Sequence, residues 1–149
     1  MNDEQKTVEE EEKKIDIVDA EGKVIGDMSV EEANEVVTDL LVDGVHFENV
    51  EVLGVKFKLK TLTKGARAAL VKKISDMEDS GMVVQDELVT LNLSNSLVEA
   101  DGNTVKNVED AYELLVSLEE HVFDKLYDEY LKLMFKVQAA INNPDAPKN

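Results

Sequence analysis

The clearest hydrophobic pattern in the chain is an alternation of apolar and charged residues between positions 50 and 60. The apolar positions are Val50, Val52, Val55, Phe57 and Leu59. The charged positions that alternate with them are Glu51, Lys56, Lys58 and Lys60. A period of two predicts strands with one buried and one solvated face, and Gly54 marks a tight turn between them. We therefore predict a hairpin over 46–62, with strands at about 46–53 and 55–62.

A second hairpin, followed by a helix, is predicted over 14–44. Short apolar runs flank the turn Asp19-Ala20-Glu21-Gly22, where the glycine supplies a positive φ. Ser29 and Glu32 then have the spacing of a capping box, in which the serine oxygen and the glutamate carboxylate satisfy backbone N–H groups. The apolar residues that follow recur at helical spacing from Val30 to about Val42.

Residues 64–141 carry apolar positions at helical spacing almost throughout. The expected helices cover 64–79, 85–98, 108–116 and 118–141. Ser117 and Glu120 have capping-box spacing at the start of the last helix, and Asp101-Gly102-Asn103 is a turn. The predicted class is α+β, with small N-terminal β-hairpins followed by a helical bundle of about four to five helices.

The length of 149 residues and the composition of the chain ends indicate a single folded domain. Residues 1–13 are rich in glutamate and have no periodicity, which is typical of a disordered acidic arm. Asn142-Asn143-Pro144 ends the last helical pattern, and residues 144–149 are expected to form a polar tail. The single α+β domain is therefore expected over 14–143.

Composition and charge narrow the classes of function. The chain has 33 Asp and Glu against 16 Lys and Arg, a formal net charge of −17. Phosphate backbones and anionic membranes repel such a chain, so neither nucleic acid nor a membrane is an expected partner. There is no cysteine, which excludes disulfides and thiol chemistry. No apolar run approaches the roughly 20 residues of a membrane span, and the N-terminus does not resemble a signal peptide. We expect a soluble, cytoplasmic protein.

One segment reverses this charge. Residues 45–74 carry seven basic side chains and two acidic ones, and Lys56, Lys58 and Lys60 share the outer face of the predicted hairpin. These lysines can be solvated positions that pair with the acidic remainder and discourage edge-to-edge pairing of strands. They can also form a docking patch for an acidic segment of a partner. Because both interpretations are open, the three lysines are candidate partner-binding residues.

The last predicted helix has a wider apolar face than a single stripe requires. Tyr127, Tyr130, Met134 and Phe135 extend this face. One interpretation is a central helix that other helices bury on two sides. The other is a face open to a partner helix or another copy of the chain, since aromatic residues and methionine are common in adaptable interfaces. These four residues are candidate partner-binding residues, and a homo-oligomer is an open alternative.

The sequence contains no clear pattern of catalytic or metal-binding residues. His46 and His121 each lack a second ligand at metal spacing and are expected at the surface or half-buried. Aligning Gly22 with the glycine of a calcium-binding EF-hand loop puts Ile17 and Met28 at ligand positions, where neither can bind the ion. A phosphate-binding loop and a nucleophile elbow are also missing. We expect no metal, no cofactor and no enzymatic activity.

The order of these elements resembles a known family. The strand Val55-Lys56-Phe57-Lys58-Leu59-Lys60-Thr61-Leu62-Thr63 leads directly into a helix, and a later turn reads Leu97-Val98-Glu99-Ala100-Asp101-Gly102-Asn103 before a helix pair. This layout, over roughly 48–143, is similar to that of the tail assembly chaperones of long-tailed bacteriophages. The resemblance implies a non-enzymatic protein of the host cytoplasm. It implies two partners, the tape-measure protein, which copies of the chaperone coat, and the tail-tube subunits, which they recruit.

Two other classes of function compete with this expectation. The net charge suits an acidic mimic of DNA that occupies the nucleic-acid site of a host protein, although the basic segment argues against a continuous row of carboxylates. The protein could also be a structural component of a virion or of another assembly. Salt dependence of binding distinguishes the first alternative, and presence in purified particles distinguishes the second.

Overall fold

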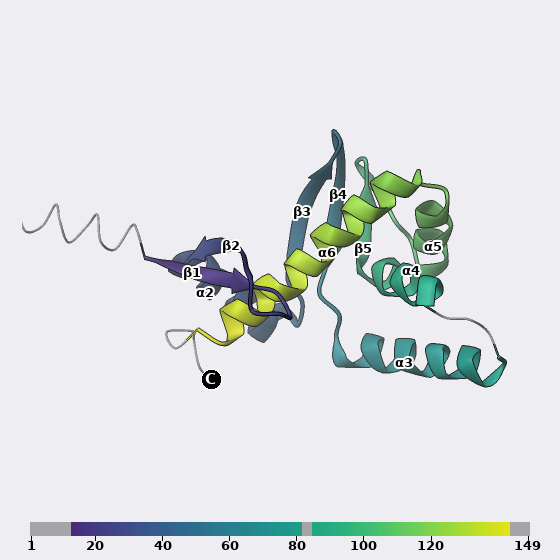
Figure 1. Ribbon diagram of the computed structural model, residues 1–149, viewed down its shortest axis with the longest axis horizontal. Coiled ribbons are helices and arrows are strands. Elements are labelled where there is room, and N and C mark those ends of the chain that lie inside the picture. Colours follow the sequence, from purple (N-terminus) through teal and green to yellow (C-terminus); the bar gives the residue numbers. More distant parts are fainter. Residues whose placement is uncertain (1–12, 82–84, 144–149) are drawn as a thin grey trace, which may run out of the picture. The chain divides into compact units, whose positions relative to one another are not determined.

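The computed structural model describes residues 13–81 and 85–143 (Figure 1). Its two antiparallel sheets and five helices confirm the α+β class for these residues. The predicted tail, 144–149, and all but the last residue of the predicted arm, 1–13, lie outside the described residues. The chain divides into two compact units, and the predicted domain over 14–143 covers both of them. That they fold as one domain stays a prediction.

Unit 1 comprises the described parts of Met1–Gly44 and Lys132–Asn149. Strands β1 (Lys14–Val18) and β2 (Val24–Ser29) form the predicted antiparallel hairpin. In the turn, the Asp19 carboxylate accepts hydrogen bonds from the backbone N–H groups of Glu21 and Lys23, at 3.0 and 2.9 Å. Gly22 follows with φ 82°, as its place in the turn predicts.

Helix α2 (Val30–Asp43) begins at the predicted serine cap. Ser29 Oγ accepts a hydrogen bond from the N–H of Glu32 at 3.0 Å. The Glu32 carboxylate forms an ion pair with Lys136 Nζ at 2.7 Å, on a segment more than a hundred residues away along the chain. Gly44, with φ 78°, ends the helix in the left-handed conformation that glycine adopts easily.

The core of unit 1 combines residues from two distant segments of the chain, 15–40 and 135–140. Its buried residues are Ile17, Met28, Ala33, Val36, Val37 and Ala140. Around them pack half-buried apolar residues of the hairpin, α2 and the last helix, namely Ile15, Ile25, Leu40, Phe135, Val137 and Ala139. The end of the last helix is therefore part of the core that the N-terminal hairpin and α2 require.

Unit 2, Val45–Leu131, contains the predicted central hairpin within a larger sheet. Strands β3 (Phe47–Val52) and β4 (Val55–Lys60) pair antiparallel, slightly shorter than predicted. Strands β5 (Leu97–Ala100) and β6 (Asn103–Thr104) complete a sheet of order β3-β4-β5-β6. Figure 1 labels β3, β4 and β5.

The prediction of a helix over 85–98 is wrong at its C-terminal end. Helix α4 (Gln85–Ser96) stops at Ser96, and the next four residues are strand β5. Strand β5 pairs with β4, and Ser96 Oγ donates a hydrogen bond to the Lys60 carbonyl at 2.6 Å. The apolar residues of a short segment fit either a helix or a strand, so the open edge of β4 decides between them.

Four helical segments of the described residues belong to unit 2 together with its sheet. They are α3 (Lys64–Asp79), α4, α5 (Val108–Val116) and the first half of α6 (Glu120–Ile141), and α6 ends in unit 1. Thr63 and Asn107 cap α3 and α5 through their side-chain oxygens. The predicted capping box at Ser117 is wrong, because Ser117 Oγ donates to the Leu114 carbonyl and the Glu119 carboxylate accepts from the first N–H groups of α6.

The two hairpin turns of unit 2 both use two consecutive residues with positive φ. These are Leu53 (φ 50°) with Gly54 (φ 86°), and Asp101 (φ 51°) with Gly102 (φ 82°). Such turns match the twist of the flanking strands, and their first position favours asparagine or aspartate. Leu53 is the unfavourable choice, because a branched apolar residue gains nothing there and its side chain is 66% exposed.

We predict that Leu53→Asn stabilises the protein. Asparagine tolerates positive φ, whereas this conformation costs other L-residues about 1–2 kcal/mol. The gain in the free energy of unfolding should be about 0.5–1 kcal/mol, measured by urea denaturation. Gly54→Ala should lower stability, although no neighbouring atom lies within 4 Å of the added methyl group, because φ is +86° there. An unchanged midpoint for both variants would contradict the assigned turn.

Candidate protein-binding site

The register of the β3–β4 hairpin places the three candidate lysines on one face of the sheet. Residues directly opposite each other in an antiparallel pair project to the same side. The opposite pairs on this side are Lys60 with Phe47, Lys58 with Asn49, and Lys56 with Glu51. Phe57 and Leu59, which alternate with the lysines, are 3% and 0% exposed. The predicted two-sided hairpin is thus confirmed, with lysines on its solvated face.

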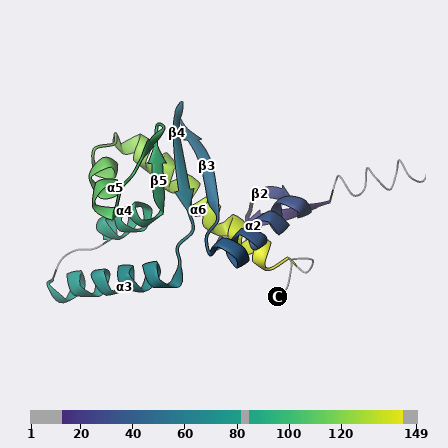
Figure 2. The same cartoon turned by 180° about the vertical axis from the view of Figure 1, so that it is seen from behind.

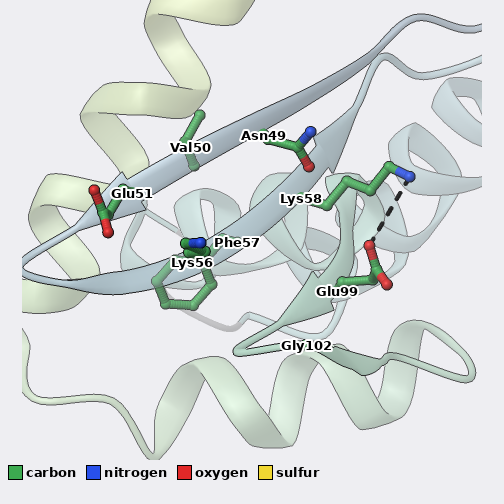
Figure 3. Close-up of a pocket in the computed structure, with 8 residues that line it drawn as sticks. All are labelled: Asn49, Val50, Glu51, Lys56, Phe57, Lys58, Glu99 and Gly102. Carbon is green, nitrogen blue, oxygen red and sulfur yellow. Dashed lines mark ion pairs between the residues drawn. The ribbon is translucent and has the colours of Figure 1, made fainter.

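Strand β5 extends this solvated face through Glu99, which lies opposite Lys58. We call the surface the lysine face. It consists of Phe47, Asn49, Glu51, Lys56, Lys58, Lys60 and Glu99. A pocket of about 440 Å³ opens on it, lined from β3, β4, β5 and the turn at Gly102 (Figure 3).

Lys58 makes two contacts on the lysine face. Its Nζ lies 3.9 Å from Glu99 Oε2 and 5.1 Å from the centre of the Phe47 ring. Both charged side chains of the ion pair remain more than one-third exposed. An exposed ion pair is worth about 0–1 kcal/mol, and an exposed cation–π contact about 0.5–1 kcal/mol. Lys58 is therefore oriented by its neighbours, yet it can exchange Glu99 for a carboxylate of a partner at little cost.

Four members of the lysine face were not among the predicted site residues, namely Phe47, Asn49, Glu51 and Glu99, although the alternation had already placed Glu51 on the same side as the lysines. The first three could have been found by pairing the two predicted strands residue by residue around Gly54. Glu99 could not, because no strand was predicted after the helix expected over 85–98, so nothing placed Glu99 beside β4. Phe47 is 44% exposed and is the aromatic residue of the face.

The remaining cations of the basic segment lie on helix α3. Lys64, Arg67, Lys72 and Lys73 are all exposed. The helix ends in the acidic residues Asp76, Glu78 and Asp79. The positive charge of this acidic protein is thus concentrated on β4 and on the N-terminal part of α3.

The four candidate residues of the last helix belong to different units. Tyr127 and Tyr130 lie in unit 2, whereas Met134 and Phe135 lie in unit 1. Tyr130 is only 4% exposed and stacks on Tyr127, with ring centres 5.7 Å apart. Burial raises the pKa of Tyr130. Phe135 packs against the core of unit 1. Tyr130 and Phe135 thus contribute to the interior of their units, whereas Tyr127 and Met134 are half-buried. A role of these four residues in binding a partner stays a prediction.

The two histidines occupy different environments. His46 is 12% exposed, and its Nε2 lies 2.8 Å from Glu48 Oε2. His121 is 81% exposed, and its Nδ1 lies 2.7 Å from Glu119 Oε1. Both placements match the prediction of half-buried or surface histidines. Within residues 13–81 and 85–143, no three His, Asp or Glu side chains gather in a way that could hold a metal ion.

The Glu119–His121 pair should make the start of α6 sensitive to pH. The hydrogen bond between the two side chains raises the pKa of His121 and lowers the pKa of Glu119. The histidine contribution is present below its ordinary pKa and is lost as pH rises through the raised value. The carboxylate contribution is present above its ordinary pKa and is lost as pH falls. The pair therefore acts mainly between the ordinary pKa of Glu119, 4.5, and that of His121, 6.5.

An NMR titration of the His121 ring tests this geometry. We expect a pKa above 6.5 in the natural chain and a value closer to 6.5 in Glu119→Gln. Glu120→Gln should change the pKa less, because Glu120 acts on His121 only through its charge and not through a hydrogen bond. Equal effects of the two substitutions would contradict the pairing.

Comparison with protein-family models, with curated proteins and with solved structures finds no match to this chain. Among the helices of the described residues, none is both long and apolar enough to cross a membrane. The lysine face is the surface of the described residues that combines clustered cations, an exposed aromatic ring and a pocket.

Proposed function

We propose that this protein is a non-enzymatic chaperone of bacteriophage tail assembly. In this proposal it acts in the host cytoplasm, binds the tape-measure protein and recruits tail-tube subunits. The order of elements over 48–143, which is similar to that of this family, supports the proposal. A long helical protein with exposed apolar stripes aggregates unless another protein covers it, and a highly charged cover keeps the complex in solution.

The observation that carries the proposal is the lysine face on a chain of net charge −17. Most of the surface repels an acidic partner, whereas this face offers three lysines and the exposed ring of Phe47 beside a pocket. Cations around an apolar group suit a helical segment that carries both carboxylates and apolar side chains. We therefore expect the lysine face to be the contact surface for the tape-measure protein.

Co-expression with the tape-measure protein of the same phage tests this function. The natural chain should keep the tape-measure protein in the soluble fraction. The triple variant Lys56→Glu, Lys58→Glu and Lys60→Glu should weaken binding by about tenfold or more, since each exposed pair is worth about 0.2–1 kcal/mol and reversal adds repulsion.

Lys106→Glu provides the matched comparison, because Lys106 is exposed and lies outside the lysine face. This variant should retain binding, measured by calorimetry on the purified proteins. If the tape-measure protein is equally insoluble with and without the natural chain, the proposed function is wrong. If Lys106→Glu and the triple variant lose binding equally, the lysine face is not the contact surface.

The DNA-mimic alternative has one specific observation in its favour. Glu31, Glu35 and Asp39 recur at every fourth residue along α2, which spaces their carboxylates by about 6 Å of helix rise. A mimic would bind a basic DNA-binding protein, and its affinity would collapse between about 50 and 200 mM salt. A virion component, in contrast, would be retained in purified particles, from which a chaperone should be absent.

A further inference from the structure

A second pocket of unit 2 is lined by residues of three helices. It has a volume of about 260 Å³ and lies among α3, α4 and α5, which Figure 2 shows from behind. Its apolar lining consists of Met77, Leu91 and Val108, and Leu91 is 2% exposed. The volume far exceeds the roughly 30 Å³ that one water molecule takes up in the liquid. The pocket therefore has room for side-chain atoms from another segment.

The remaining lining of this pocket is mostly negative. Glu87, Glu109 and Glu113 contribute carboxylates, and Lys73 is the cation among the lining residues. The Tyr112 hydroxyl donates to both carboxylate oxygens of Glu87, at 2.7 and 3.0 Å, and joins α5 to α4. This bond raises the pKa of Tyr112 and holds the Glu87 carboxylate in place. Such a pocket suits an apolar side chain that is flanked by positive charges.

The exposed side of α3 carries an apolar side chain flanked by positive charges, which is the kind of surface that suits this pocket. Its residues follow the spacing of one helix face, at positions i, i+3, i+4, i+7 and i+8. They are Lys64, Arg67, Ala68, Val71 and Lys72, and all are exposed. We call this surface the basic face of α3. Val71 is 56% exposed at its centre, between the cations.

A chain cannot place this basic face in its own pocket. Helix α3 contributes Lys73 and Met77 to the pocket, and Leu70, 5% exposed, lies on the same inward side. Val71 and Lys72 project from the opposite side of the helix, because residues of one face recur every three to four positions. A basic face that occupies such a pocket must therefore come from another molecule, and a second copy of this chain supplies one.

We propose that the basic face of α3 docks into the α3–α4–α5 pocket of a second copy. Val71 enters the apolar lining, and Arg67 and Lys72 meet Glu109 and Glu113 while their aliphatic stems cover apolar surface. The two surfaces are different patches of one molecule, so the contact is head-to-tail and each added copy exposes the same pair of surfaces again. The contact requires no tape-measure protein, so its test is independent of the test of the proposed function.

Sedimentation velocity of the full chain at about 150 mM NaCl tests the proposal. The natural protein should form dimers and larger species as concentration rises. A variant with Arg67→Glu and Lys72→Glu should associate at least tenfold more weakly, and so should a variant with Glu109→Lys and Glu113→Lys. Mixed in equal amounts, these two variants should associate again and beyond the dimer, because the natural pocket of one meets the natural basic face of the other and the two reversed surfaces are complementary as well. All four substitutions in one chain should restore self-association.

The two double variants separate this contact from general repulsion. The first lowers the net charge by four and the second raises it by four, so repulsion alone would make the second associate more strongly. Lys106→Glu with Lys125→Glu, at exposed positions elsewhere, should leave association unchanged. Since the substituted residues are exposed, circular dichroism should show the natural helix content. A natural chain that stays monomeric at about 1 mM, or an equal mixture that does not dimerise, overturns the proposal.

Discussion

Phe57→Asp is expected to unfold unit 2. Phe57 is 3% exposed, lies opposite Val50 on β3 and opposite Ala100 on β5, and is therefore in the middle of the buried face of the sheet. Removing a buried phenylalanine costs about 3–5 kcal/mol, and burying an unpaired carboxylate adds to that cost. The sum is comparable with the total stability of about 5–15 kcal/mol that is usual for a domain.

Thermal denaturation followed by circular dichroism measures this effect. The melting temperature should fall by about 15 °C or more, or the cooperative transition should disappear. Lys56→Asp is the matched variant, because the neighbouring side chain projects from the exposed face; it should shift the transition by only a few degrees. A soluble Phe57→Asp protein that melts cooperatively near the natural temperature would show that the strand register is wrong.

Met28→Asp is expected to have a comparable effect on unit 1. Met28 is 2% exposed and belongs to the buried cluster that also contains Ala33, Val36 and Ala140. Removing a buried methionine costs about 2–5 kcal/mol before the charge is counted. Because Ala140 and the half-buried Phe135 pack in the same cluster, the substitution should also loosen the end of α6, more than a hundred residues away in sequence.

Hydrogen exchange measured by mass spectrometry resolves where the loss occurs. In Met28→Asp, amides of β1, β2, α2 and residues 132–141 should exchange at least tenfold faster than in the natural chain. Val24→Asp, on the same strand with Val24 54% exposed, should leave these rates almost unchanged. Faster exchange in 14–44 without any change in 132–141 would show that these two segments do not share a core.

Features that depend on residues close in sequence could be predicted well. Ser29, Thr63 and Asn107 start helices because their side-chain oxygens reach N–H groups three residues ahead. The helices over 64–79 and 108–116 have the predicted bounds. The alternation around Gly54 also predicted which side of the hairpin carries the lysines, since the period of two leaves one arrangement that buries the apolar residues.

Features that depend on distant segments could not be predicted. Strand β5 forms because it can pair with the edge of β4, about 40 residues earlier in the chain. By local preference alone, the four residues of β5 fit a helix equally well. Ser117 and Glu119 both suit a helix start, and the fold of the α5–α6 connection assigns the cap of α6 to Glu119. For the same reason, only part of the candidate site could be predicted. The positions of its lysines are set by one hairpin, whereas Glu99 joins them only through the pairing of β5 with β4.

The sequence by itself determined the α+β class, both N-terminal hairpins, most helix bounds and the solvated position of Lys56, Lys58 and Lys60. Hydrophobic periodicity and helix caps determine these features, and both depend on residues that are close together in the sequence. The tertiary structure alone decided that the end of α6 completes the core of the N-terminal unit. It also placed Tyr130 inside unit 2. An apolar helix face in the sequence indicates that this face is buried. Packing between segments far apart in the chain determines which side chains bury it.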